Sequence, residues 1–298
     1  MNEKLFRYSI AALLLCVALP VAAQPALRDI QVRHNLLSSK ELPKPAFVQL
    51  TWPENDSLVA VVGLGIRAGI GKATRFDTGL FAEYLRNTAA SQDAVRAGLD
   101  IHWQVLALGK YPGGRSHSPL LLAQLNYKKD GVKDAVSVQA AINYTHIFQS
   151  NRLLPLPNTY YTLGDILDLT YAPYLGAELE SETAGKNPDE GTTVRGVARL
   201  DVSVYPNVCA FWDDGKGICR VLEGTLQLAH RHDLISPIEN GDRNHSYLEA
   251  GLNLFFVRSD DGKRRAGIGI TYTKGEDPAK GFRDQKITQV VLTVLVVP

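Results

Sequence analysis

The residues best suited to chemistry lie in a polar stretch, HRHDLISPIENGDRNHSY, that begins at residue 230. Imidazole and hydroxyl side chains that lie close together can supply the base and the nucleophile of acyl transfer. The candidates for such roles are His230, Ser236, His245 and Ser246. A hydrophilic connection between two strands is also rich in His, Asn, Ser and Asp without any catalytic task. The sequence therefore supplies candidates but assigns no catalytic residue.

Metal and cofactor sites are not indicated by the other motifs. His230 and His232 would share one face of a strand, but they supply only two of the three or four protein ligands of a zinc site. The glycines of VVGLGIRAGIG, between Gly63 and Gly71, lie in an apolar strand pattern without a helical pattern after it. We expect them to relieve crowding in a curved sheet rather than to bind phosphate. The sequence predicts no cofactor and no metal.

The N-terminus has the pattern of a secretion signal. Lys4 and Arg7 precede the apolar run IAALLLCVAL, which is followed by small residues up to Ala23. An apolar run of about ten residues is too short to span a bilayer as a helix, which disfavours the alternative of an N-terminal anchor. We expect residues 1–23 to be removed, leaving a leading segment at 24–44 and one domain over 45–298.

Two cysteines follow that signal, Cys209 and Cys219, in the segment VCAFWDDGKGICR. Gly215 and Gly217 lie between them and allow the chain to reverse, so the two Cα atoms can approach. An even number of cysteines in an exported chain favours a disulfide over two free thiols. The sequence therefore predicts a loop closed by this disulfide.

Charge argues against one class of partner. The chain has 32 Lys and Arg and 31 Asp and Glu, a formal net charge of +1, and the two signs are mixed along the sequence. Nucleic-acid-binding proteins concentrate basic residues in a patch or stripe. We therefore expect no nucleic-acid partner.

Alternation with a period of two residues dominates the sequence after residue 45. In GVARLDVSVYP, for example, Leu200 and Val202 share one face of a strand, and Arg199 and Asp201 share the other. About twelve such segments occur, with spacing that suits the strands of about ten residues that cross a bilayer. Their centres lie near residues 49, 62, 82, 103, 124, 141, 170, 198, 226, 251, 268 and 291. The sequence predicts an all-β, antiparallel transmembrane barrel, with one extra short strand near 29–33.

Connections of two kinds separate these strands. Pro53 to Asp56, Asp130-Gly131 and 260–262 have the composition of tight turns, whereas longer polar connections begin near 109, 181, 235 and 274. Counted back from the C-terminus, the Asp130-Gly131 turn falls on the end where an outer-membrane barrel has long loops. Either a strand is miscounted near 148–165, or the usual rule of loop lengths does not hold for this chain.

The polar face of the alternating strands is expected to line the lumen, and the apolar face to contact lipid. The predicted lumen-lining residues are Asp100, His102, Gln104, Asp168, Arg199, Asp201, Glu223, Gln227, Glu249 and Asn253. Aromatic residues near the ends of the apolar stripes are expected to form interfacial girdles. These are Tyr144, Phe148, Tyr171, Tyr174, Tyr205 and Tyr272.

In this pattern, residues 45–297 resemble the broad family of Gram-negative outer-membrane β-barrels. The resemblance lies in architecture and not in a diagnostic motif. It implies location in the bacterial outer membrane, contact with outer-membrane lipid and insertion by the barrel-assembly machinery. Lipid hydrolases with this architecture resemble one another in a compact His-x-Ser-Asn-Gly motif, which the stretch from residue 230 lacks.

Three functions follow from this resemblance. Because twelve strands enclose a lumen between that of a filled eight-stranded barrel and an open porin, we expect a narrow porin-like channel for small solutes. The alternative is a structural or surface-binding barrel whose lumen is plugged by side chains. A lipid hydrolase is the third possibility.

Overall fold

The computed structural model describes most of the chain between residues 27 and 296. The described ranges are 27–32, 46–51, 59–70, 75–87, 92–106, 108–109, 116–131, 134–148, 156–164, 166–184, 191–207, 221–237, 242–258, 264–277 and 282–296. Within them, no helix is long and apolar enough to cross a membrane. The expected secretion signal at 1–23 and the two cysteines Cys209 and Cys219 lie outside these ranges. The signal and the disulfide therefore remain predictions.

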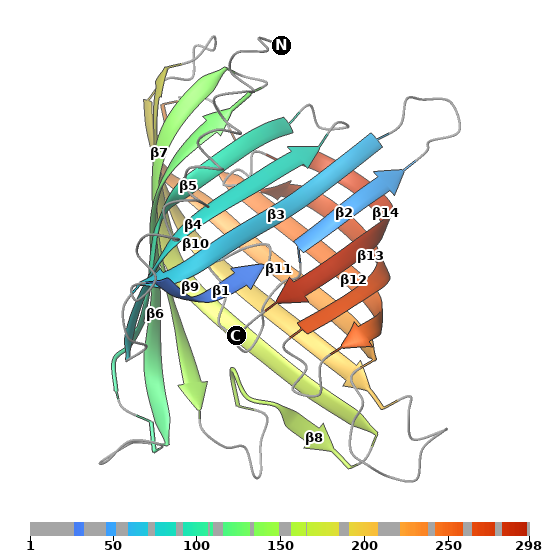
Figure 1. The fold of residues 1–298 in the computed structure, drawn as a ribbon. Helices are drawn as coiled ribbons and strands as arrows, with labels where there is room; N and C mark the ends of the chain where they lie inside the picture. The colour runs from blue at the N-terminus through green and yellow to red at the C-terminus, as the bar shows by residue number, and fades with distance from the viewer. Residues whose placement is uncertain are drawn as a thin grey trace.

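Strands make up almost all of the described residues, and they form one antiparallel sheet (Figure 1). They are β1 (Leu27–Val32), β2 (Ala46–Thr51), β3 (Val59–Ile70), β4 (Phe76–Asn87), β5 (Gln92–Gln104), β6 (His117–Asp130), β7 (Ala135–Phe148), β8 (Tyr161–Leu163), β9 (Leu167–Ala184), β10 (Gly191–Pro206), β11 (Leu222–Ile235), β12 (Asn244–Arg258), β13 (Arg264–Asp277) and β14 (Phe282–Val296). All twelve predicted centres fall inside strands.

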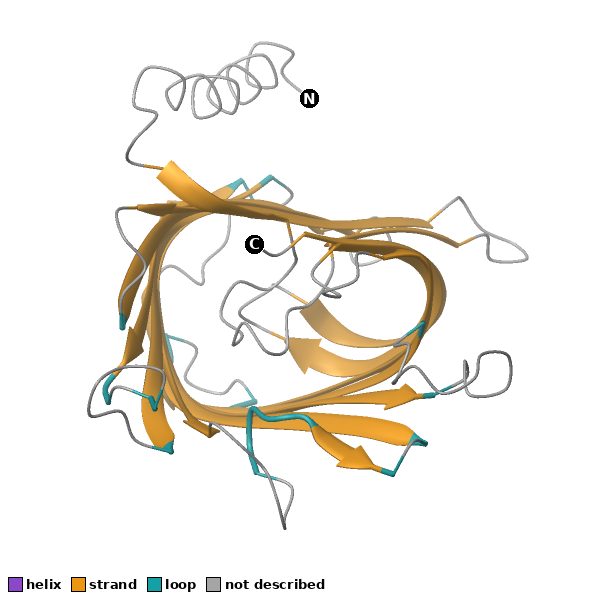
Figure 2. Cartoon of the chain, turned by 60° about the horizontal axis from the view of Figure 1, so that its bottom comes forward, coloured by secondary structure: helices purple, strands orange, loops and turns teal. Residues whose placement is uncertain are grey.

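Two short strands close the sheet into a ring. β2 pairs with β3 from Phe47↔Gly63 to Thr51↔Val59, and β1 continues along β3 from Leu27↔Ile70 to Val32↔Ile66. Both also pair with β14, so β1 and β2 together fill one position of the wall. β8 pairs with β9 alone. The described wall therefore has twelve positions, seen end-on as a ring in Figure 2, and the predicted antiparallel barrel of about twelve strands is confirmed.

The two ends of the barrel differ in the length of their connections. At the end that we call the turn end, uppermost in Figure 1, the connections are short: 52–58, 88–91, 131–134, 185–190, 236–243 and 278–281. The opposite end, which we call the loop end, has the three longest connections, 105–116, 149–166 and 207–221. β1 begins and β14 ends at this loop end as well.

The Asp130-Gly131 turn lies at the end opposite the three longest connections. Since β8 adds no position to the wall, the conflict over this turn does not come from a miscounted strand near 148–165. The long polar connections expected from residues 181 and 274 are wrong. β9 continues to Ala184 and β10 begins at Gly191, and β13 continues to Asp277 and β14 begins at Phe282, so only 185–190 and 278–281 connect these strands.

The wall between β7 and β9 is completed by a separate segment at the loop end. Direct pairing of these strands stops at Tyr144↔Leu175. Beyond it, Asn158 bridges the two: its backbone N–H donates to the Tyr171 carbonyl (2.7 Å), and its side-chain Nδ2 donates to Thr145 Oγ1 (2.9 Å) and to the His146 carbonyl (2.8 Å). Asn158 has a φ of 57°, a left-handed conformation that asparagine tolerates better than most residues.

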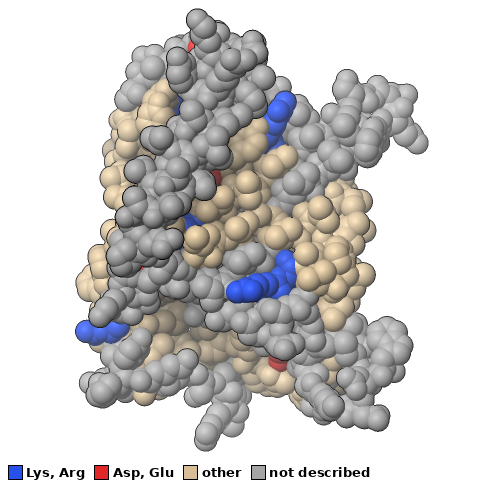
Figure 3. Space-filling view, in the orientation of Figure 1, with Lys and Arg blue, Asp and Glu red and all other residues tan. Residues whose placement is uncertain are grey.

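The two faces of the wall have opposite chemistry. Leu252 and Ile270 are 52% and 54% exposed, whereas Arg199 and Asn253 are 8% and 6% exposed. The buried face is the inner one, because its side chains reach across an intervening strand, as Lys128 of β6 does across β7 to Glu180 of β9. Where Figure 3 shows described residues, the outer surface has few charged side chains. A soluble barrel would have the opposite arrangement.

The structure describes the two strands on either side of the predicted disulfide, but not the disulfide itself. β10 and β11 are adjacent, and their pairing runs to Val204↔Gly224, so Cys209 and Cys219 lie in the connection of one hairpin. We expect mass spectrometry after thiol alkylation of unreduced envelope protein to find both cysteines unmodified. Two alkylated thiols without prior reduction would contradict the disulfide. Cys209→Ser should leave the barrel folded, because so short a ring contributes at most about 3 kcal/mol.

Candidate functional site

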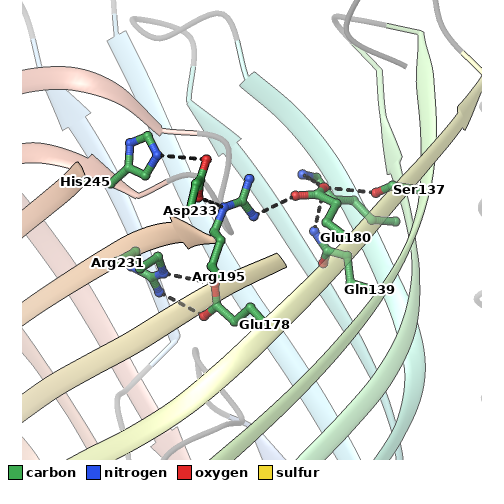
Figure 4. A network of polar contacts seen from close by, with 9 residues as sticks. Ser137, Gln139, Glu178, Glu180, Arg195, Arg231, Asp233 and His245 are labelled. Carbon is green, nitrogen blue, oxygen red and sulfur yellow. Dashed lines mark hydrogen bonds and ion pairs between the residues drawn. The ribbon is translucent and has the colours of Figure 1, made fainter. Parts of the chain in front are cut away.

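The inner wall near the turn end contains a network of charged side chains centred on Glu180 of β9 (Figure 4). Lys128 Nζ from β6 lies 3.0 Å from Glu180 Oε1, which also accepts from Gln139 Nε2 (2.8 Å) and Ser137 Oγ (3.1 Å) of β7. Arg195 Nη1 of β10 lies 3.2 Å from Glu180 Oε2. The Glu180 carboxylate of β9 thus contacts side chains from three other strands, β6, β7 and β10.

The same network continues around the ring toward β13. Arg195 Nε lies 2.9 Å from Asp233 Oδ1, and Asp233 Oδ2 lies 3.3 Å from His245 Nε2. His245 Nδ1 is in turn 2.9 Å from Glu276 Oε1. Next to this chain, Arg231 of β11 reaches over β10 to Glu178 of β9 at 3.0 Å (Figure 4). The charges at this height are paired, which is what burial of charge requires.

A second charged group lies nearer the loop end, around Arg67 of β3. Arg67 is fully buried, with Nε 2.6 Å from Asp100 Oδ2 and Nη2 3.3 Å from Asp77 Oδ2. His102 Nε2 lies 3.1 Å from the same Asp100 oxygen. A Cβ at Gly79 would be 2.8 Å from the Arg67 guanidinium and 2.7 Å from Asp100, so this glycine makes the space for the pair.

Two of the predicted girdle tyrosines belong to the inner wall instead. Tyr174 and Tyr205 are 1% and 2% exposed. Each lies an even number of residues from an inward residue of its strand, Asp168 or Asp201, and therefore has the same parity and shares the inner face. Tyr205 Oη donates to Glu223 Oε1 at 2.5 Å. Each tyrosine ring also faces an arginine: Arg199 lies 4.1 Å from the Tyr174 centroid, and Arg265 lies 5.8 Å from that of Tyr205. The girdle prediction is wrong for both.

The ten predicted lumen residues all lie on the inner parity of their strands. Asp168 accepts from Thr162 Oγ1 (2.6 Å), Glu249 from Tyr247 Oη (2.6 Å), and Gln104 Nε2 donates to the Leu106 carbonyl (2.8 Å). Arg199 Nε lies 3.4 Å from Asp201 Oδ2. The rest, Asp100, His102, Glu223, Gln227 and Asn253, are buried.

Acidic residues outnumber basic ones on this wall. Among the described residues, thirteen Asp and Glu have the inner parity or pair with a group on it: Asp77, Glu83, Asp100, Asp130, Asp168, Glu178, Glu180, Glu182, Asp201, Glu223, Asp233, Glu249 and Glu276. Seven Lys and Arg with described side chains do so: Arg67, Arg96, Lys128, Arg195, Arg199, Arg231 and Arg265. The described side chains of the inner wall therefore have a negative excess.

The four catalytic candidates do not form one site. His230 and Ser246 meet on the outer face of β11 and β12, with Nδ1 3.1 Å from Oγ. His245 lies on the inner face with Asp233 and Glu276, and Ser236 follows the end of β11. In the part of the chain that the structure describes, no group of three or more His, Cys, Asp or Glu side chains is placed to hold a metal ion.

An apolar cluster on the inner wall was not anticipated from the sequence. Leu120, Leu122, Ile147, Ala172 and Tyr174 are buried together near the loop end, and Leu108 packs against them. Leu108 lies in the β5–β6 connection, and its side chain packs on the inner wall. The alternation of the sequence does predict the inward position of two of these residues. Leu120 and Leu122 lie four and two residues before the inward Gln124, so all three side chains share one face of β6.

A closed antiparallel ring with a charged inner face and an exposed apolar outer face is the architecture of outer-membrane β-barrels. This chain has that architecture.

Comparisons with known proteins found similar solved structures, all at low sequence identity. No family model and no curated protein matches the sequence. An anion-selective porin from Comamonas acidovorans is 10% identical, with 92% of this chain and 99% of that chain covered at a TM-score of 0.34. OmpT, an outer membrane protein of Vibrio cholerae, is 9% identical, with 91% and 97% covered at a TM-score of 0.24. A chain from work on the in-meso crystallization of membrane proteins is 8% identical, with 85% and 83% covered at a TM-score of 0.38.

Proposed function

We propose that this chain is a narrow channel in the bacterial outer membrane that passes small solutes and favours cations. The observation that supports this most directly is the polar inner wall of a closed barrel whose outer wall is apolar. Such an outer face is matched to lipid, and a charged inner face is matched to water and polar solutes. Outer-membrane lipid and the barrel-assembly machinery are the partners that this location implies.

The small size of the solutes follows from how the inner wall is packed. Arg67, Arg231 and Glu223 are each less than a tenth exposed, because neighbouring inward side chains cover them. Ion pairs such as Lys128–Glu180 and Arg231–Glu178 cross an intervening strand, so these side chains lie over the wall and narrow the passage. A wide, water-filled pore would leave its wall charges exposed.

The preference for cations follows from the acidic excess on the inner wall. Rings of Asp and Glu favour cations in a pore, and Arg or Lys favour anions. At the turn end, Arg195 and Arg231 are paired with Glu178, Glu180 and Asp233, so the net charge comes from the carboxylates in excess of such pairs.

Planar bilayer recording tests both parts of this proposal. Purified protein should give small, discrete conductance steps, and in a KCl gradient the reversal potential should have the sign of K⁺ selectivity. Glu249→Gln, which removes one half-buried inner carboxylate, should reduce that selectivity. Thr288→Val, which changes an exposed residue on the outer face, should leave the K⁺ selectivity unchanged. Selectivity for Cl⁻ would overturn the charge argument.

A plugged barrel is the second candidate, and the inner apolar cluster is the observation that favours it. The cluster formed by Leu120, Leu122, Ile147, Ala172 and Tyr174 is covered in part by Leu108 from a connection. In a barrel closed by such packing, many insertions into a planar bilayer would give no conductance steps. That result would replace the channel with a structural or surface-binding barrel.

A further inference from the structure

Two histidines of adjacent strands meet on the outer face of the barrel at the loop end. His117 begins β6, and His146 lies near the end of β7, where it is paired with Pro119. His117 Nδ1 lies 2.9 Å from His146 Nε2. His117 is the first residue of β6 and is paired with Phe148, the last residue of β7, so the histidine pair lies at the rim of the outer face, within reach of water and ions.

The neighbouring aromatic residues hold His146 in this position. Tyr144 Oη lies 2.9 Å from His146 Nδ1, and the Phe148 ring lies 4.9 Å from the His146 ring and 5.9 Å from that of His117. Because Tyr144 occupies Nδ1, the other ring nitrogen of His146 is directed at His117. A metal-binding histidine is typically fixed in the same way, through a hydrogen bond from its second nitrogen.

We propose that His117 and His146 form a binding site for one divalent transition-metal ion of the zinc, copper and nickel class. Imidazole nitrogens bind such ions at about 2.0–2.1 Å, which for tetrahedral geometry places the two nitrogens about 3.3 Å apart. The nitrogens at 2.9 Å therefore need to separate by only roughly 0.4 Å. The ion replaces the proton shared by the two rings, and water completes its coordination at this exposed site.

The other two outward histidines of the described strands lack this geometry. His230 Nδ1 lies 3.1 Å from Ser246 Oγ, and His232 Nδ1 lies 3.0 Å from Asn244 Oδ1. Each therefore faces a neutral oxygen on β12 and not a second imidazole. They provide a control on the same outer surface, with the same residue type and similar exposure.

The position of the site gives the metal a structural effect. His146 lies beyond Tyr144, the last residue of β7 that pairs directly with β9. An ion held by His117 and His146 would join the ends of β6 and β7 at the place where the wall depends on Asn158. The site does not depend on conduction, so the channel proposal can fail without affecting it.

Calorimetric titration with ZnCl₂ tests the site, on folded, detergent-solubilised protein without a histidine tag. The wild type should bind one Zn²⁺ saturably, and CaCl₂ should give no binding, because imidazole suits zinc rather than calcium. His117→Gln and His146→Gln should each remove this binding, and Tyr144→Phe should weaken it by about tenfold or more. His230→Gln should bind like the wild type. Zn²⁺ should raise the thermal unfolding midpoint of the wild type and of His230→Gln equally, that of Tyr144→Phe less, and those of His117→Gln and His146→Gln not at all.

Three results would overturn the proposal. One is the absence of saturable Zn²⁺ binding to the wild type, and another is unchanged binding to His117→Gln and His146→Gln. The third is an equal loss in His230→Gln. Circular dichroism of each variant shows whether it is folded, and Tyr144→Phe keeps both imidazoles in place if a histidine variant does not fold.

Discussion

Replacement of Leu252 by arginine is expected to block stable insertion of the barrel, whereas Leu252→Phe should leave it intact. Leu252 lies in the middle of β12, on the outer face, opposite Ile270 of β13. Both side chains are more than half exposed, as lipid-facing residues are in a protein without its lipid. A charge at the bilayer midplane on this face costs about 2–4 kcal/mol, and phenylalanine has no such cost.

Thr271→Arg provides the matched control for charge. Thr271 is the next residue after Ile270, but it is half-buried on the inner face and lies opposite Gly251, which has no side chain. The free energy of folding into lipid vesicles, measured by urea titration, should therefore be much less favourable for Leu252→Arg than for the wild type. For Thr271→Arg it should be close to that of the wild type. Equal effects of the two arginines would mean that the outer face does not contact lipid.

Arg67→Met is expected to cost about 3–5 kcal/mol of folding free energy, the loss typical when one partner of a buried ion pair is removed. Asp100 and Asp77 would then both be left in the wall without their guanidinium partner. The exposed Arg86→Met of β4 should change stability by no more than about 0.5 kcal/mol. Urea unfolding of the inserted protein measures both.

The double variant Arg67→Met with Asp100→Asn separates loss of charge balance from loss of packing. If uncompensated charge causes the loss, neutralising Asp100 should recover part of the stability of Arg67→Met. A double variant that is less stable than Arg67→Met would instead attribute the effect to the shape of the guanidinium over Gly79.

The wall strands could be predicted from the sequence because alternation is a local property. Leu200 and Arg199 point to opposite faces whatever their neighbours are, so the pattern alone locates β10 and its companions. Residue type is a poorer guide than alternation at Tyr174 and Tyr205. Aromatic residues near strand ends are typical of girdles, whereas the alternation in β9 and β10 places these two side chains inside.

The contacts of the inner wall could not be predicted in this way. Lys128 meets Glu180 because the registers of β6 with β7 and of β7 with β9 bring residues 52 positions apart to the same height. Register between distant strands depends on turn geometry and on the whole ring, which alternation does not encode. β8 and the bridge made by Asn158 were missed because neither has an alternating pattern long enough to detect.

The shared wall position of β1 and β2 has a consequence for the rate of folding. The other neighbouring strands of the described wall are consecutive in the chain or separated by one short strand, but Val32↔Val296 and Leu50↔Val290 join strands more than 200 residues apart. The entropy of closing a loop grows only logarithmically, by about 0.6 kcal/mol for each doubling of length, so this contact is affordable at equilibrium. Contacts between distant residues nevertheless form slowly. The hairpins should therefore form early, and the joining of β14 to β1 and β2 should set the time that the chain needs to become a ring.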